Sequence, residues 1–198
     1  MKRLVLATRN QHKANEIKDI LRDINLEILT VADFPQIPPL TEDGSTLEEN
    51  ALKKVRTVFL ATKLPSLADD SGLEVFYLAK RPGVFSARYA GPNAAYEANN
   101  KKLLTELRGV PPRRRNAQFR CVIAVVTDKG ERTVEGIMEG KILEAPRGSN
   151  GFGYDPIFQP KGHSQSYAEM ISDVKNKISH RAKALEKVKP LLRNYLGV

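Results

Sequence analysis

Residues 67–72, Leu-Ala-Asp-Asp-Ser-Gly, place two adjacent carboxylates at the end of an apolar run. Around this segment, Ser66 to Asp69 and Leu73 to Leu78 each predict a short strand. If one strand continued through both aspartates, their side chains would point to opposite faces of the sheet. A turn is the alternative, because Asp, Ser and Gly are all favoured in turns. A turn explains one aspartate better than two, since adjacent like charges repel unless a cation or donor compensates them.

Strand and helix patterns are mixed on both sides of this segment. Further strands are predicted at 2–8, 26–31, 117–127 and 133–138, the last two as a hairpin. Helices are predicted after residue 13, after a Thr46–Glu49 capping box, over 94–107 and after Ser179, with one or two helical turns at 167–171. Pro190 should kink or split the last helix. The mixture predicts an α/β fold with a mixed sheet. Because no clear linker interrupts it, we expect one domain over residues 1–198.

The composition is that of an ordinary globular chain. Its 198 residues are 41% hydrophobic and 28% charged, which is enough for a sizeable core. No apolar run is long enough for a transmembrane helix, and the N-terminal apolar run is too short for a signal peptide. The single cysteine, Cys121, excludes an intrachain disulfide, and its apolar neighbours predict a buried thiol. We therefore expect a cytoplasmic protein with no membrane partner.

The formal net charge of +9 has two interpretations. One is an anionic ligand such as a nucleotide or nucleic acid, and the other is a solvated basic surface. The strongest basic cluster, Arg113-Arg114-Arg115, follows two prolines in a predicted loop. No nucleic-acid-binding signature accompanies it, so we expect no nucleic-acid partner.

The segment Thr8-Arg9-Asn10-Gln11-His12-Lys13 lies between a predicted strand and a predicted helix. A helix N-terminus at this position favours phosphate, because backbone N–H groups and the positive end of the helix dipole point at the ligand. The glycines of a Walker loop are absent. The alternative is an ordinary polar connection in which Asn10 caps the helix.

Acidic side chains of two segments are candidate metal ligands. Mg²⁺ prefers hard oxygen ligands and usually takes one or two carboxylates, so Asp69 and Asp70 suit it. Glu42 and Asp43 precede the capping box and have no capping explanation of their own. They are either solvated loop acids or a source of a second metal carboxylate.

Two segments near the C-terminus are candidates for binding a planar ring or a phosphate. In Gly151-Phe152-Gly153-Tyr154-Asp155-Pro156 the glycines allow close approach of the backbone, and the aromatics could stack on a base. A glycine-rich turn whose aromatics pack into the core explains them equally well. Ser179-His180-Arg181, with Lys175 before it, places cations at a helix N-terminus, which hints at an anionic ligand; solvated charge is the alternative.

Taken together, these segments resemble the inosine triphosphate pyrophosphatase family. The residues that carry the resemblance are 6–13, 41–44 with 49–51, 67–73, 82–91, 151–158 and 179–181. Each motif is weak alone, but six in family order are highly specific, and the match as a whole runs from about residue 4 to residue 185. The resemblance implies a mixed, curved β-sheet flanked by helices, with two lobes around a nucleotide-binding cleft.

The resemblance also implies an activity. The family hydrolyses non-canonical purine nucleoside triphosphates (ITP, dITP and XTP) to the monophosphate and pyrophosphate, which cleanses the nucleotide pool. It requires Mg²⁺, and its members are usually cytoplasmic homodimers.

Residue by residue, the resemblance implies a role for most of these candidates. Asp70 corresponds to the catalytic carboxylate and, with Glu42, to the metal ligands. Ser71 and Lys54 correspond to substrate contacts, Lys54 on phosphate. The expected phosphate loop is Thr8, Arg9, Asn10, Gln11, His12 and Lys13, although many bacterial members have Gly where Arg9 stands. The expected base-side residues are Phe152, Gly153, Tyr154, Asp155, Lys175, His180 and Arg181. The role of Asp69 is left open, as second-sphere support or as a structural hydrogen bond.

Two other functions remain as alternatives. A phosphatase acting on nucleotides or sugar phosphates would release orthophosphate, but the Asp-x-Asp spacing of covalent-aspartate phosphatases is absent at 69–70. A basic module binding RNA or DNA through Arg113 to Arg115 would show salt-dependent affinity. The paired acids would have no role in such a module.

Overall fold

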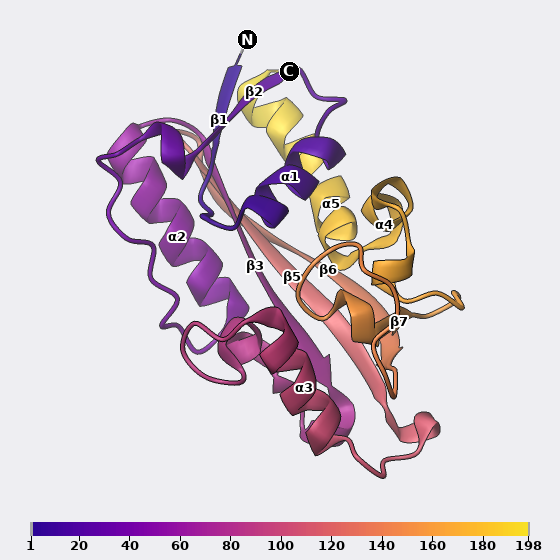
Figure 1. Cartoon of the computed structure of the whole chain (residues 1–198). Coiled ribbons are helices and arrows are strands. Elements are labelled where there is room, and N and C mark those ends of the chain that lie inside the picture. Colours follow the sequence, from indigo (N-terminus) through magenta and orange to yellow (C-terminus); the bar gives the residue numbers. More distant parts are fainter. Residues whose placement is uncertain (1, 198) are drawn as a thin grey trace. The chain divides into compact units, whose positions relative to one another are not determined.

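The structure is a computed structural model that describes residues 2–197 (Figure 1). The strands are β1 (Lys2–Leu6), β2 (Leu26–Thr30), β3 (Ser66–Val75), β4 (Arg81–Pro82), β5 (Asn116–Thr127), β6 (Gly130–Ile142) and β7 (Phe158–Pro160). The helices are α1 (Gln11–Ile20), α2 (Leu47–Thr62), α3 (Tyr96–Glu106), α4 (Ser172–Ile178) and α5 (His180–Leu196). The predicted strand–helix mixture is therefore present along the chain.

The strands pair in both directions. Their hydrogen-bonded order is β2-β1-β3-β5-β6-β7, with β4 beside β3. β1 pairs in parallel with β2 and with the start of β3, whereas β3 pairs antiparallel with β4 and β6 pairs antiparallel with β7. The α/β class and the mixed sheet are thus confirmed.

The described chain divides into two compact units. The first unit contains residues 2–70, 121–136 and 181–197, and the second contains residues 71–120 and 137–180. Neither unit is a continuous piece of sequence. Strands β3, β5 and β6 each begin in one unit and end in the other, because the divisions fall after residues 70, 120 and 136.

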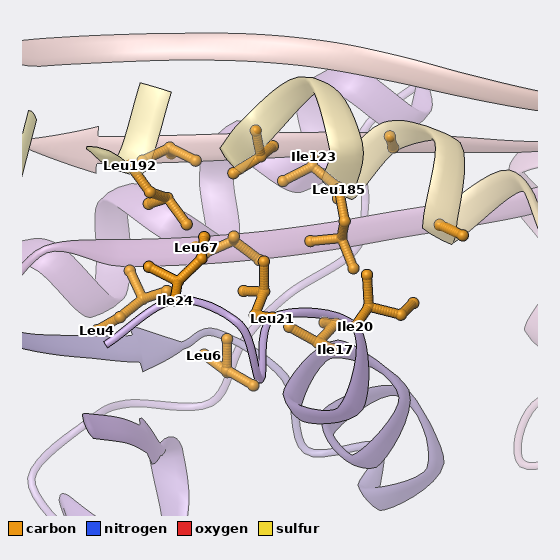
Figure 2. Close-up of a cluster of buried hydrophobic side chains, with 14 of the residues drawn as sticks. Leu4, Leu6, Ile17, Ile20, Leu21, Ile24, Leu67, Ile123, Leu185 and Leu192 are labelled. Carbon is orange, nitrogen blue, oxygen red and sulfur yellow. The ribbon is translucent and has the colours of Figure 1, made fainter. Parts of the chain in front are cut away.

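The first unit has a core of aliphatic side chains. Ile17, Ile20 and Leu21 of the α1 region pack with Leu185 and Leu192 of α5 (Figure 2). The strands contribute Leu4, Leu6, Leu67, Cys121, Ile123 and Val125 to the same cluster. Ala14, Ile17 and Ile20 recur at helical spacing, so α1 buries one face against this core.

The second unit has a core rich in aromatic rings. Phe119 of β5 lies 4.7 Å from Phe158 and 6.0 Å from Tyr167, measured between ring centroids. Leu103 and Leu107, at the C-terminal end of the α3 region, are buried in the same cluster. These contacts fix α3 and the segment around β7 to the strands of this unit.

One strand replaces the two that the sequence predicted around the aspartates. β3 runs from Ser66 to Val75 without interruption, so Asp69 and Asp70 are strand residues and the turn interpretation is wrong. Only Phe76–Leu78 departs from the strand, as a single 3-10 turn. The strand continues because cations compensate both aspartates, as described below.

Smaller differences concern the hairpin and the last helix. β6 is longer than the predicted 133–138 and spans Gly130–Ile142. Pro190 lies inside α5, which continues to Leu196 and is not split. Buried Leu185, Val188 and Leu192 hold the helix to the core on both sides of the proline. Within residues 2–197 we find no helix long and apolar enough to span a membrane.

Candidate functional site

The candidate residues form two groups, one in each unit. The first group comes from the segment between β1 and α1, the start of α1, the loop before α2, α2 itself, Asp70 of β3 and the start of α5. It contains Thr8, Arg9, Asn10, Gln11, His12, Lys13, Glu42, Lys54, Asp70 and Arg181. The second group contains Ser71, Phe152, Gly153, Tyr154, Asp155, Lys175 and His180.

Asp69 and Asp70 point to opposite faces of β3, as strand geometry requires. The two carboxylates consequently have different partners. Asp69 is 1% exposed and Asp70 is 5% exposed. Burying two adjacent carboxylates is unfavourable unless each is paired with an opposite charge. On each face of the strand a cation provides that pairing.

Asp69 joins three elements of the first unit. Its Oδ2 accepts hydrogen bonds from Arg181 Nε and from the thiol of Cys121, each at 3.0 Å. Its Oδ1 forms an ion pair with Lys13 Nζ. Burial raises the pKa of Asp69, but Arg181 and Lys13 outweigh burial and hold this pKa well below its usual range. Asp69 is therefore a buried carboxylate that stays ionised.

Asp70 faces α2 and the loop that precedes it. Lys54 Nζ donates to Asp70 Oδ1 at 2.9 Å, to Glu42 Oε1 at 2.6 Å and to the backbone carbonyl of Asp69 at 2.8 Å. Asn50 Nδ2 donates to Asp70 Oδ2 at 3.3 Å, while Gly44 N donates to Asn50 Oδ1 at 2.7 Å. Asn50 thus ties the loop that carries Glu42 to the strand that carries Asp70.

The two acids around Lys54 differ in pKa. Burial raises the pKa of Asp70, and Lys54 only partly offsets that effect. Burial also raises the pKa of Glu42, but there Lys54 outweighs burial and the pKa is lowered. Raised carboxyl pKa values are common at catalytic positions, and Asp70 is the predicted catalytic carboxylate.

The donor set around Lys54 fits a hard divalent cation. Glu42 and Asp70 each place a carboxylate oxygen within 3 Å of the same ammonium nitrogen, so the two carboxylates already converge on one cation. Mg²⁺ commonly takes one or two carboxylates and completes its shell with water and phosphate. Residues 2–197 hold no cluster of three or more His, Cys, Asp or Glu side chains suited to a metal.

The predicted phosphate loop connects β1 to α1 as expected. Asn10 is the N-cap: its Oδ1 accepts from Lys13 N at 3.2 Å, and its own N donates to Thr8 Oγ1 at 3.1 Å. The capping interpretation of Asn10 is therefore correct. It is compatible with phosphate binding, because the cap fixes the helix N-terminus. Arg9, Gln11 and His12 are exposed.

In the second unit, the segment from Gly151 to Asp155 folds around the Asp155 carboxylate. Asp155 Oδ2 accepts from Phe152 N at 2.9 Å and from Lys175 Nζ at 2.5 Å. A Cβ on Gly151 would collide with this carboxylate, and both Gly151 and Gly153 have positive φ values, +73° and +64°. The glycines serve this turn, which the sequence also allowed as an explanation.

The two aromatic residues of this segment have different environments. Tyr154 is buried in the core and its hydroxyl donates to the carbonyl of Ser86 at 2.9 Å. Phe152 is partly exposed, with Lys175 Nζ 4.9 Å from its ring centroid. Of the two rings, Phe152 is the one placed to stack on a ligand.

Lys175 and His180 are both buried, whereas Ser71 is partly exposed on β3. Lys175 Nζ lies 5.5 Å from the Tyr167 ring centroid, in addition to its contacts with Asp155 and Phe152. The His180 ring stacks on Phe119 with centroids 4.6 Å apart and planes inclined by 10°. Arg181 belongs to the first unit, where Glu16 accepts from its Nη1 at 2.5 Å.

Several side chains that contact these groups were not predicted from the sequence as site residues. Asn50, Glu16 and Cys121 contact the aspartates or their cations. Asn100 of α3 donates from Nδ2 to the carbonyl of Gly153 at 3.0 Å. For Asn50 a signal was available, because it belongs to the 49–51 segment that helps to carry the family resemblance.

A cavity of about 880 Å³ lies in the second unit beside α3. Tyr96 and Asn100 of α3 line it, together with Phe152 and Gly153. The base-side segment therefore borders open space large enough for a small molecule.

Other charged candidates have structural partners. Asp43 pairs with Lys53 at 2.5 Å on the exposed side of α2, so it is a solvated loop acid. Arg115 is buried, and its guanidinium donates to carbonyls of Ile142, Leu107 and Leu143 at 2.9 to 3.1 Å. Of the basic cluster at 113–115, Arg115 is therefore not at the surface, whereas Arg113 and Arg114 are exposed.

Comparisons with known proteins agree over the full length of the chain. The model of the Ham1 family matches residues 4–191. The chain is 50% identical to a dITP/XTP pyrophosphatase of Geobacter sulfurreducens, over 100% of this chain and 98% of that protein. It is also 50% identical to a dITP/XTP pyrophosphatase of Clostridium perfringens, over 99% of this chain and 100% of that protein. A HAM1 protein from Coxiella burnetii has a similar structure, with a TM-score of 0.88 at 42% identity, over 98% of this chain and 100% of that chain.

Proposed function

Since this chain belongs to the Ham1 family, we propose that it is a nucleoside triphosphate pyrophosphatase acting on non-canonical purine nucleotides. Its substrates would be ITP, dITP and XTP, and its products the nucleoside monophosphate and pyrophosphate. The observation that carries the proposal is the 50% identity, over the whole chain, to relatives named dITP/XTP pyrophosphatases. The six motifs that resembled the inosine triphosphate pyrophosphatase family point to the same activity.

The first unit supplies the residues for the triphosphate. The N-terminus of α1, with Thr8 to Lys13, offers backbone N–H groups and a dipole end suited to phosphate oxygens. Lys13 and Lys54 add positive charge. Phosphoanhydride hydrolysis requires a positioned water and neutralised phosphate charge. Asp70, whose pKa burial raises, would orient that water or accept its proton.

We further propose that the enzyme uses Mg²⁺, held by Glu42 and Asp70. The support is the convergence of both carboxylates on one cation, described above. Bound Mg²⁺ would neutralise charge that develops on the phosphates. The protein's own part is to keep the two carboxylates together, which Asn50 does through Gly44 and Asp70.

The second unit supplies the residues for the purine. Phe152 presents a ring face, and Lys175 and His180 are donors expected near the 6-keto group. Adenine carries an amino group at that position, which cannot accept a hydrogen bond from such a donor. A hydrogen bond lost in this way costs about 1–3 kcal/mol, or about tenfold to a hundredfold in discrimination.

The proposal is tested by a steady-state panel of ITP, dITP, XTP, GTP and ATP with Mg²⁺, in which pyrophosphate and orthophosphate are detected separately. We expect pyrophosphate from the first three and much slower turnover of GTP and ATP. Release of orthophosphate instead would indicate a phosphatase. Equal rates on all five would remove the proposed selectivity, and loss of activity in EDTA tests the metal requirement.

We also propose that the protein is a cytoplasmic homodimer. Phe76 and Phe85 of the second unit are 46% and 59% exposed, and association with a second copy would cover such apolar surface. The only cysteine, Cys121, is buried and hydrogen-bonded as a thiol, which suits a reducing compartment. Light scattering at several protein concentrations tests the dimer.

A further inference from the structure

Lys54 lies between Glu42 and Asp70, the two carboxylates that would hold the proposed metal ion. Its ammonium group has three N–H donors, and three oxygens accept from it at 2.6 to 2.9 Å. Two of these oxygens belong to the proposed metal ligands. An ammonium and a divalent cation cannot both lie between the same carboxylate oxygens.

We propose that Lys54 is an internal counter-ion, which holds the metal site together in the nucleotide-free enzyme and which the metal must displace. This inference rests on the proposed function, because that function supplies the metal and the triphosphate. It assigns Lys54 a second role beside the phosphate contact implied by the family resemblance.

Burial makes this displacement costly without a nucleotide. The Lys54 side chain is 4% exposed and the Asp70 side chain is 7% exposed. If a metal took both carboxylates, the Lys54 ammonium would keep only the carbonyl of Asp69 among the partners described above. A buried charge that loses its partners is strongly unfavourable, so the nucleotide-free enzyme should bind Mg²⁺ weakly.

A triphosphate removes this cost. Lysine is a compact charge on a flexible stem, and phosphate oxygens would offer the displaced ammonium new acceptors. Metal and nucleotide would therefore favour each other's binding, and such coupling is reciprocal. The site would bind free metal ions weakly and would bind them tightly only together with the nucleotide.

The test measures metal affinity in the absence of nucleotide. Mn²⁺, as a paramagnetic substitute for Mg²⁺, is titrated into the full-length protein and free Mn²⁺ is followed by electron paramagnetic resonance. We expect Lys54→Met to bind Mn²⁺ more tightly than the wild type by roughly 5- to 150-fold, the usual range for coupled ligands. Equal or weaker binding by this variant would overturn the proposal.

Matched variants separate the counter-ion from general effects of charge. Lys53→Met removes a neighbouring lysine of α2 that pairs with exposed Asp43, and it should bind Mn²⁺ like the wild type. Lys54→Arg keeps a cation and should stay weak. Adding Glu42→Gln to Lys54→Met should abolish the gain. A gain in Lys53→Met of the same size would contradict a specific role of Lys54.

Thermal melting provides a second measurement. Lys54→Met leaves two carboxylates facing each other, so its melting temperature should fall without metal and recover with Mn²⁺, by a larger shift than in the wild type. If Lys54→Met does not fold, Lys54→Gln, which keeps polar donors, is measured in its place. We expect its melting temperature to change in the same directions. A metal-induced shift no larger than that of the wild type in these variants would count against the proposal.

The test of the Lys54 counter-ion can fail or succeed independently of the test of the proposed function. Pyrophosphate release from dITP by the wild type tests the activity alone. An active wild type whose Lys54 variants gain no metal affinity would overturn only the counter-ion. An inactive wild type whose variants gain affinity would overturn only the pyrophosphatase.

Discussion

Each unit buries a lysine against an aspartate, and the two pairs differ in what surrounds them. Lys54 meets Asp70 among oxygens only, from Glu42 and from the backbone of Asp69. Lys175 meets Asp155 between the rings of Phe152 and Tyr167. The side chains of both pairs are at most 7% exposed.

The difference shows how one kind of ion pair can serve two purposes. Oxygens that bind an ammonium can also bind a divalent cation, so the pair in the first unit suits exchange with a metal. Aromatic faces attract an ammonium through the ring quadrupole and add no metal ligand. The pair in the second unit therefore suits holding a ring in place.

The largest expected effect is on turnover, and it comes from substituting Asp70, the acid of the Lys54–Asp70 pair. Asp70→Asn removes the proposed base and one metal ligand but keeps the shape of the side chain. We expect kcat for dITP to fall on the order of 10²- to 10⁴-fold, while nucleotide affinity measured by calorimetry largely survives. Near-normal turnover would exclude Asp70 as base or essential ligand.

A large loss of stability is expected at the neighbouring aspartate. Asp69→Asn takes the carboxylate away from two cations, the largely buried Lys13 and the fully buried Arg181. Removing one partner of a buried pair costs about 3–5 kcal/mol, which chemical denaturation would detect. Cys121→Ala removes only the thiol donor and serves as control, with a much smaller expected loss. Equal losses would show that the ion pairs contribute little.

A smaller effect is expected from breaking the second pair. Lys175→Met removes the charge that joins Asp155 to Phe152, so the Phe152 ring should lose its fixed position. We expect KM for dITP to rise by about tenfold, equivalent to about 1.4 kcal/mol, with kcat changed less. Lys177→Met, on the exposed side of α4, should leave KM unchanged. A change in kcat alone would place Lys175 with the chemistry instead.

The smallest expected effect is a pH dependence that comes from Tyr89 of the second unit. Burial and a 2.6 Å hydrogen bond to Glu106 raise the pKa of Tyr89 to about 12 from 10.0. A group with a raised folded pKa contributes stability that is present below its unfolded pKa and is lost as the pH rises through the folded one. Melting temperatures should therefore fall between about pH 10 and pH 12, and Tyr89→Phe should flatten part of that fall. An unchanged slope in Tyr89→Phe would contradict the shift.

Much of the fold could be predicted because local patterns match it. The alternation of strands and helices, the N-cap at Thr46 and the hairpin around Lys129 all depend on neighbouring residues. The reciprocal half of the predicted capping box differs, because the Glu49 carboxylate accepts from Ser45 N at 2.7 Å. The continuous course of β3 through Asp69 and Asp70 could not be predicted in the same way. Asp69 and Asp70 stay in β3 because Lys13, Arg181 and Lys54 compensate them, and these cations lie far from the aspartates in the sequence.

The candidate site shows the same limit. Motifs identified Asp70, Glu42 and the glycine-rich segment, but no spacing rule linked Asn50 to Asp70 or Lys175 to Phe152. Such partners are set by packing between elements, which sequence periodicity does not encode. The strand geometry did predict that the two aspartates would have separate roles, because alternation along a strand is a purely local property.

The discontinuity of the first unit has a consequence for how the protein is made. Its core requires Leu185 and Leu192, and Asp69 requires Arg181, all of which leave the ribosome after residue 180. Residues 71–120 and 137–180, in contrast, are complete by then. Although domains usually fold in the order of synthesis, here the unit that contains the amino-terminal strands is the one that must wait for the carboxy-terminal helix.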